Sequence, residues 1–328
     1  MPNQSLFRST MVACAIFLIA SVLAMQLNSY FLYVVTLGAI FATLAVSFDV
    51  LLGYTGYLSL AHGALFGVGA YSCGILTARY GLSFWSALFL AGVITGAFGA
   101  LVALASFRTR GLYFAVLTLG IGLIGHQLFL VFSDLTGGIG GLAGIPSPSK
   151  PNFAWLNQNR WNAFLALALL LLTYVMAQVF VRSRLGAACL AVREDLTLAQ
   201  ALGIRVSRAR FAAFLFSAVF TGLAGGLFAA ISNFIAPETF TVLGTGFQLV
   251  ALVVVGGMGT LWGPILGAAL LTALPEALRV ASGYSLLIYG MLLLIFILFA
   301  PKGLAGILGK MSTHFVRSAK TKTVEVSS

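Results

Sequence analysis

Long apolar stretches alternate with short polar connections along the whole chain. A helix that crosses a bilayer needs about 20 mostly apolar residues, within a range of roughly 17 to 25. The stretches that meet this requirement are 11–27, 30–52, 58–78, 83–105, 112–132, 162–182, 211–235, 246–262, 264–281 and 284–300. These runs are continuous and do not alternate in segments of about ten residues, which excludes an outer-membrane β-barrel. The pattern predicts an all-α integral membrane protein, a polytopic helical bundle of about ten transmembrane spans in one domain over residues 1–310.

Two of these regions are interrupted by irregular sequence, which leaves open whether they contain re-entrant segments. The stretch 58–78 is rich in glycine and polar at its start. The region 246–281 is interrupted by Gly256, Gly257, Gly259, Gly263 and Pro264. Irregular backbone is tolerated at membrane depth only where protein or a water-filled cavity surrounds it. The first stretch follows Arg8 and resembles a signal sequence, but it lacks a small-residue cleavage site, so we predict an uncleaved span.

Composition agrees with a membrane protein. Hydrophobic residues make up 60% of the chain and charged residues 8%, whereas soluble domains carry about 25% charged residues. The net charge of +11 does not indicate nucleic-acid binding, because the basic residues are confined to a few loops and form no stripe with exposed aromatic residues.

The positions of the basic residues predict the orientation, because inner loops of membrane proteins are enriched in lysine and arginine. With the N-terminus inside, 14 of the 18 basic residues fall on the inner side: Arg8, Arg108, Arg110, Arg182, Arg184, Arg193, Arg205, Arg208, Arg210, Lys302, Lys310, Arg317, Lys320 and Lys322. Those left on the outer side are Arg79, Lys150, Arg160 and Arg279. We therefore predict that both termini lie inside, with a basic cytoplasmic tail at 311–328.

Two connections are long enough to carry structure of their own. The outer, periplasmic one, 133–161, is rich in turn-forming residues. The inner, cytoplasmic one, 183–210, has apolar residues at helical spacing, namely Leu190, Leu198, Ala201 and Leu202. This spacing predicts a short amphipathic helix or helix pair at the cytoplasmic surface. The neighbouring Glu194 and Asp195 favour a protein partner for it over a lipid surface.

Polar residues within the apolar stretches are candidates for a solute path. The segment GYTGYLSLAHG at 53–63 holds Tyr54, Ser59 and His62, which either face a solute or satisfy backbone groups at a capped helix start. The other candidates are His126, Gln127, Asn233 and Gln248. Intramembrane polar residues are functional candidates by default, but a single histidine or glutamine also often joins two helices by a hydrogen bond.

Catalytic chemistry is not indicated. The sequence has no phosphate-binding GxxxxGK[ST], no HExxH and no GxSxG, and its three cysteines lie in separate segments without metal or redox spacing. A hydrolase built on Ser59 and His62 would lack an oxyanion element and an orienting acid. No span carries an acid at its middle, and Asp49, near the inner end of its span, is interpreted either as a helix-end residue or as a side chain that extends toward water. We expect no catalytic residue, metal or cofactor in this chain.

Five sequence blocks carry a family resemblance over about residues 30–306. In chain order they are GYTGYLSLAHGALFGVGAY, TGGIGGLAGIP, SRLGAACLAVREDLTLAQALGI with FAAFLFSAVFTGLAGGLFA, VVVGGMGTLWGPILGAALL and PKGLAG. Together they resemble the high-affinity branched-chain amino acid permease family of bacterial ABC importers, the type with the longer outer loop. The resemblance implies a type II importer-like permease in the inner membrane. Its implied partners are a second related permease subunit, two cytosolic ATPase subunits that bind ATP and Mg²⁺, and a periplasmic binding protein.

The resemblance also implies that the segment 183–210 couples to the ATPases. The coupling candidates are Arg184, Arg193, Glu194, Asp195, Leu202 and Gly203. Family members carry an acid shortly before an Ala-Leu-Gly; here Gln200 takes that place, and Glu194 and Asp195 are the acids of the segment. Some relatives import urea and short amides, so these are the alternative cargo to branched-chain amino acids. A stand-alone secondary transporter is the alternative function.

Overall fold

A computed structural model describes residues 2–106, 109, 111–151, 156–278, 285–299 and 303–306. The predicted basic tail at 311–328 lies outside the described residues. So do several of the basic residues used for the orientation: Arg108, Arg110, Arg279, Lys302, Lys310, Arg317, Lys320 and Lys322.

Within the described residues, each predicted stretch contains one main helix. These helices are α1 (Pro2–Met25), α2 (Ser29–Thr55), α3 (His62–Ala78), α4 (Phe84–Ala105), α5 (Leu112–Val131), α7 (Gln158–Arg182), α10 (Val206–Ser232), α11 (Phe247–Gly256), α12 (Gly263–Ala277) and α13 (Ser285–Phe299). The shorter elements are α6 (Ser133–Thr136), η1 (Gly138–Gly140), β1 (Leu142–Ala143), α8 (Arg184–Glu194), α9 (Leu196–Ala201), β2 (Phe234–Ile235), η2 (Pro237–Phe240) and the π-helix η3 (Val242–Gly246). The described chain is therefore almost entirely helical, as predicted.

Five of these helices, α2, α4, α5, α7 and α10, are long and apolar enough to cross a membrane. Shorter apolar helical stretches run over Thr10–Ala24, Val242–Gly256 and Gly263–Glu276. The prediction of ten spans thus depends on five full-length helices together with shorter ones.

Both regions predicted to be irregular are irregular. Residues 56–61 are not continuous helix, so α3 begins only at His62, four residues later than predicted. In the second region α11 ends at Gly256, and α12 starts at Gly263 with Pro264 in its first turn, where a missing backbone N–H costs nothing.

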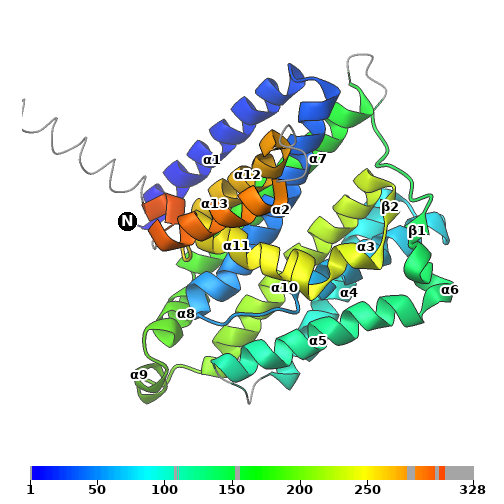
Figure 1. Ribbon diagram of the computed structural model, residues 1–328. Coiled ribbons are helices and arrows are strands. Elements are labelled where there is room, and N and C mark those ends of the chain that lie inside the picture. Colours follow the sequence, from blue (N-terminus) through cyan, green and yellow to red (C-terminus); the bar gives the residue numbers. More distant parts are fainter. Residues whose placement is uncertain are drawn as a thin grey trace, which may run out of the picture.

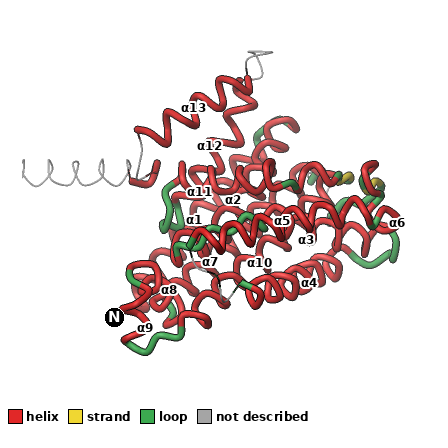
Figure 2. The backbone as a smooth tube through the Cα atoms, turned by 60° about the horizontal axis from the view of Figure 1, so that its bottom comes forward, coloured by secondary structure: helices red, strands yellow, loops and turns green. Residues whose placement is uncertain are grey.

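Helices α2 and α10 form the centre of the bundle. Helix α10 packs against α2, α3 and α4, and α2 packs also against α7 and α12 (Figure 1). Helix α13 packs mainly against α11 and α12 and stands apart from the other helices at the top of Figure 2.

Small residues allow the central helices to approach closely. At the crossing of α3 and α10, a Cβ added to Gly69 would lie 2.3 Å from the carbonyl oxygen of Gly222. On the other side of α10, a Cβ added to Gly222 would lie 2.4 Å from Thr95 Oγ1 of α4. Gly222 and Gly226 of α10 are four residues apart, and small residues at this spacing let helix backbones approach closely.

Connections group at two opposite ends of the bundle. One end, here called the arginine-rich end, holds α8, α9, the segment 56–61 and the α11–α12 loop, whereas α6, β1 and β2 lie at the other end (Figure 1). At this second end β1 and β2 pair antiparallel, with Leu142 opposite Ile235. Arg79 also donates a hydrogen bond there to the carbonyl of Asp134.

Candidate functional site

The helix pair predicted in 183–210 is present as α8 and α9. The Ser183 hydroxyl accepts a hydrogen bond from the backbone N–H of Gly186 (3.3 Å) and caps α8. The Asp195 carboxylate accepts from Thr197 N (2.8 Å) and Leu198 N (2.9 Å) and caps α9, so this coupling candidate has a structural role at a helix N-terminus.

The leucines whose helical spacing predicted this helix pair lie on its outer surface. Leu198 is 58% exposed, Leu202 is 72% exposed and Leu190 is also exposed. The residues that α8 and α9 bury are Gly186, Cys189, Val192 and Ala199. Small buried residues let the pair lie close to the bundle, and this leaves the larger leucines free on the outer face.

The remaining coupling candidates are exposed around these leucines. Arg184 and Glu194 are exposed on α8. Gly203 follows α9 with φ +78° and no atom within 4 Å of where a Cβ would lie, a backbone conformation that favours glycine. The turn at Gly203 thus separates α9 from α10.

Arg193 is exposed along α8 like its neighbours, but its guanidinium group reaches the bundle. Its Nη1 donates a hydrogen bond to the carbonyl oxygen of Gly53, in the last turn of α2. The same nitrogen would lie 2.6 Å from a Cβ added to Gly259, in the α11–α12 loop. One arginine of α8 therefore contacts both α2 and the loop that follows α11.

The side chain of Asp49 approaches the same α11–α12 loop from within α2. It is fully buried, and its Oδ1 accepts a hydrogen bond of 2.9 Å from the backbone N–H of Gly259. Its Oδ2 has no hydrogen-bond partner among the described residues, and Arg193 interacts with it electrostatically. Asp49 lies near the C-terminal end of α2, as the helix-end interpretation predicted, but its side chain does not reach toward water. We call Asp49, Gly53, Arg193 and Gly259 the α2–α8 junction.

Glycine is required at position 53 because two segments touch there. A Cβ at Gly53 would lie 2.4 Å from the backbone nitrogen of Gly259 and 2.0 Å from Asp49 Oδ1. The segments GYTGYL at 53–58 and GGMGTL at 256–261 are thus in direct contact at their glycines. Buried Tyr54 lies beside the junction, near Tyr174 of α7.

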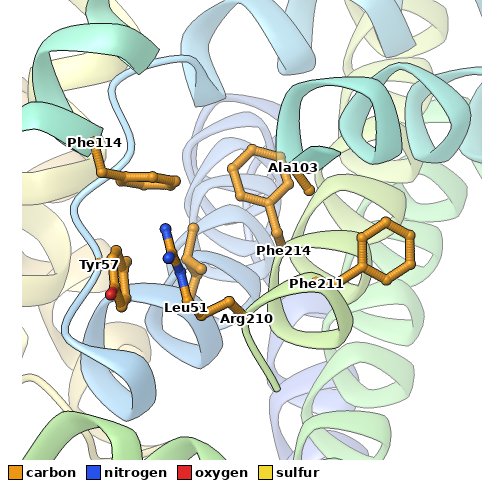
Figure 3. Close-up of a pocket in the computed structure, with 7 residues that line it drawn as sticks. All are labelled: Leu51, Tyr57, Ala103, Phe114, Arg210, Phe211 and Phe214. Carbon is orange, nitrogen blue, oxygen red and sulfur yellow. The ribbon is translucent and has the colours of Figure 1, made fainter. Parts of the chain in front are cut away.

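A second arginine at the arginine-rich end packs against aromatic rings near α5. Arg210, at the start of α10, lies 3.8 Å from the centre of the Tyr57 ring and 5.4 Å from that of Phe114. Figure 3 shows its guanidinium group between these two rings, in a small pocket also lined by Leu51 and Phe214.

Arg210 also holds the connection between α4 and α5. Its Nη2 donates hydrogen bonds to the carbonyls of Ser106 (3.3 Å) and Thr109 (2.9 Å). Aromatic faces attract a cation most strongly where water is excluded, so Arg210 is suited to fix 56–61, the α4–α5 connection and α10 together.

His62 lies in the core with both ring nitrogens hydrogen-bonded. Its Nδ1 is 3.0 Å from Ser59 Oγ and its Nε2 is 2.8 Å from Ser217 Oγ of α10. The rings of Phe48 and Phe214 lie against it. This arrangement is the one expected of a histidine that joins helices. The second ring nitrogen also contacts a serine hydroxyl, and not the carboxylate that would orient a catalytic histidine.

The other path candidates do not join this cluster. Asn233 ends α10 at the far end, with φ +57°, and its amide donates to Ile145 O (2.7 Å) and Ser147 Oγ (2.8 Å). His126 is half-buried on α5, and its Nε2 has no partner among the described residues. Gln127 is exposed on α5, and Gln248 is half-buried on α11.

The sequence interpretation therefore missed four contributors: Asp49 and Arg210 as buried charges, Ser217 as a histidine partner, and Gly259 as a contact of both junction side chains. The acid and the arginine were noted only as a helix-end residue and an inner-loop charge. Among the described residues there is no group of three or more His, Cys, Asp or Glu side chains that could hold a metal ion.

The comparisons with known proteins agree with the resemblance. Residues 30–300 match the family described as branched-chain amino acid transport system / permease component. The chain is 35% identical over 293 residues to the high-affinity branched-chain amino acid transport system permease protein LivM of Salmonella typhimurium and 36% identical to LivM of Escherichia coli. Each alignment covers 83% of this chain and 69% of the relative.

The permease protein LivH of the Escherichia coli high-affinity system is 28% identical, with 83% of this chain and 93% of the relative covered. No solved structure matches the chain. The helical architecture, the apolar helices and the family match lead to one conclusion: the chain belongs to the family of branched-chain amino acid transport permease components and is a multi-pass α-helical membrane protein that serves transport and not catalysis.

Proposed function

We propose that this chain is one of two related permease subunits of an ATP-driven importer in a bacterial inner membrane, with branched-chain amino acids as its cargo. One observation carries the coupling part of the proposal. Leu198 of α9 and Leu202, which directly follows this helix, are exposed at the arginine-rich end, while Arg193 of the preceding helix is hydrogen-bonded to α2. A protruding apolar face on a segment anchored to the bundle is suited to receive force from a partner.

The proposed topology has ten spans with both termini in the cytoplasm. Support comes from the grouping of loops, since the connections after α2, α4, α7 and α11 share the arginine-rich end, in the order that alternate crossings require. Cytoplasmic loops are enriched in arginine, so this end faces the cytoplasm. Residues 1–310 then form one permease domain, 133–161 the periplasmic loop and 183–210 the coupling loop, followed by a basic tail.

The proposed partners follow from what the chain lacks and from its relatives. The sequence has no phosphate-binding loop, so ATP and Mg²⁺ bind to two separate cytosolic subunits. LivM and LivH are both named as permease proteins of high-affinity branched-chain amino acid systems, which supports pairing with a second permease subunit. A periplasmic binding protein would deliver the solute to the end that holds β1, β2 and Asn233.

The solute path is proposed to include polar groups on α5 and α11. His126 and Gln127 lie on α5 and Gln248 on α11, and none of the three is fully buried. Tyr54, Ser59 and His62 are buried and border this path from the core, where they hold the broken start of α3. Helix ends and free backbone groups at broken helices can bind the charged groups of a zwitterion without a fixed ion pair.

In the proposed cycle, ATP binding to the partners shifts the equilibrium between outward-open and inward-open states. A ligand shifts such an equilibrium only by its differential affinity for the two states. The ATPases would supply that difference at α8 and α9, and the bundle would respond as packed helices that rearrange between two discrete positions.

The test is uptake of radiolabelled leucine by proteoliposomes that contain this chain, its second permease and the ATPases, with the binding protein added. We expect uptake that requires ATP and every subunit. Uptake by this chain alone, driven by an ion gradient, would instead identify a secondary transporter. Calorimetric titration of the binding protein with leucine, urea and acetamide separates the cargo alternatives.

A further inference from the structure

Three segments that are far apart in the sequence meet at the α2–α8 junction. Asp49 and Gly53 come from α2, Arg193 from α8 and Gly259 from the α11–α12 loop. Asp49 Oδ1 is bonded to the loop through Gly259 N, and Arg193 is bonded to the end of α2 through Gly53 O. The junction therefore connects the proposed ATPase-binding segment to two parts of the membrane bundle.

The charges at the junction depend on one another. A buried carboxylate is unfavourable unless it is paired or hydrogen-bonded, and one oxygen of Asp49 lacks a hydrogen-bond partner in the described structure. The guanidinium group of Arg193 is an opposite charge that acts on this carboxylate electrostatically, while its hydrogen bond goes to Gly53 O. It also lies at the C-terminal end of α2, where the unpaired carbonyls favour a cation.

The α11–α12 hairpin is built to move as one piece. A Cβ at Gly256 would lie 2.1 Å from Gly263 O, and one at Gly267 would lie 2.0 Å from Leu252 O, so the two helices touch through their backbones. A packed pair of this kind does not deform gradually. A displacement at Gly259 is therefore passed along α11.

The far end of α11 leads to α5. Helix α11 continues from η3, and Val242 of η3 would lie 2.7 Å from a Cβ added to Gly122 of α5. The residues Gln127 and Gln248 proposed for the path lie on these two helices. A contiguous set of packed elements thus runs from α8 through the junction to the path.

We propose that Asp49 is a positioning residue for coupling: its buried carboxylate holds Arg193 and the Gly259 loop together, so that α8 and the α11–α12 hairpin move as a unit. This inference rests on the proposed function. It assigns a role in coupling to Asp49, which has none in the proposed function above. It also identifies the α11–α12 loop as the element that moves with α8.

The first test compares Asp49→Asn with the native chain in the fully assembled importer. The amide keeps the shape of the side chain and an oxygen that can accept from Gly259 N, but it removes the charge. We expect uptake of leucine per ATP hydrolysed to fall about tenfold, while the complex still assembles and hydrolyses ATP. The matched control is Arg182→Gln, an exposed arginine at the end of α7 that is not among the coupling candidates, which should leave the ratio unchanged.

The second test measures whether the two elements move together. Spin labels on Ala187→Cys of α8 and Met258→Cys of the loop, both exposed positions, are placed in a Cys14→Ala background. In the native chain the distance between the labels should be the same with and without ATP and vanadate. With Asp49→Asn it should differ between the two conditions, because α8 then moves without the loop.

The outcomes separate the two proposals. Absence of ATP-dependent uptake by the native complex contradicts the proposed function, whereas the distance measurement does not require uptake. An unchanged uptake ratio or an unchanged label distance with Asp49→Asn overturns the positioning role. If Asp49→Asn fails to fold, Arg193→Gln, at an exposed position, must show the same loss of uptake per ATP and the same change in distance.

Discussion

Replacement of Gly53 by alanine tests how closely the α2–α8 junction is packed. The new Cβ would lie 2.4 Å from Gly259 N, whereas non-bonded heavy atoms are in contact at about 3.5 Å. Gly259 N is a backbone atom and cannot rotate away as a side chain can. The α11–α12 loop must therefore move back by about 1 Å. The Cβ would also lie 2.7 Å from Asp49 Cγ, so the carboxylate must move as well.

The expected free-energy cost has two parts. Overpacking of a tight interior costs about 1–3 kcal/mol, and loss of a hydrogen bond to a charged group, here between Asp49 and Gly259, costs about 1.5–3 kcal/mol. We expect a destabilisation of about 2.5–6 kcal/mol and a Tm lower by roughly 4–9 °C. The control is Gly120→Ala in α5, where no atom lies within 4 Å of the new Cβ.

Thermal unfolding of the purified permease in detergent measures both variants, and proteoliposome uptake measures their function. Gly120→Ala should equal or exceed the native Tm, because alanine stabilises a helix interior by about 0.5–1 kcal/mol relative to glycine. If Gly53→Ala were as stable and as active as Gly120→Ala, the contact between the two glycine segments would not exist in the membrane protein.

Three further predictions concern the arginine-rich end. The double variant Leu198→Asp and Leu202→Asp should abolish co-purification of the ATPase subunits and leave the Tm of the permease unchanged, since both leucines are exposed. A lowered Tm would show that these leucines pack inside the permease. Arg210→Gln and Tyr57→Leu should each lower the Tm. A double-mutant cycle should give a coupling energy of about 2 kcal/mol between the desolvated Arg210 guanidinium and the Tyr57 ring. A coupling energy near zero would contradict the contact in Figure 3. Burial raises the pKa of the Cys189 thiol to about 12, so the reactive thiolate is scarce below that pH. N-ethylmaleimide should therefore label Cys189 only slowly at pH 7 to 9, whereas Leu190→Cys, at an exposed position, should react within minutes. Equal labelling rates of the two cysteines, measured by mass spectrometry, would contradict the burial of Cys189.

Hydrophobic pattern predicted the helices well because the bilayer requires long apolar runs. Each predicted stretch contains a main helix, and glycines and a proline marked the break between α11 and α12. The start of α3 was placed too early, since residues 56–61 are apolar enough to continue a span but form hydrogen bonds outside a helix, such as that from Leu60 N to Thr118 Oγ1.

Side-chain direction could not be predicted in the same way. Helix α2 is apolar around its whole circumference, so nothing in the pattern tells whether Asp49 faces lipid, water or protein. The leucines of α8 and α9 had helical spacing, but their buried neighbours are smaller, as Cys189 and Ala199 show. The partner of His62, Ser217, is 155 residues away and has no local signal.

The short helices have an electrical consequence. Helix α3 has 17 residues and the stretch Val242–Gly256 has 15, which at 1.5 Å per residue are about 26 and 22 Å long, against a hydrocarbon thickness of about 30 Å. Irregular backbone fills the remainder, next to protein or water, and wherever water enters there the membrane voltage falls over a shorter distance than across lipid. Moving one net charge through that field involves about 2.3 kcal/mol per 100 mV. A zwitterion carries no net charge, so its passage would be indifferent to the membrane potential, and hydrolysis of ATP would be free to set the direction of transport.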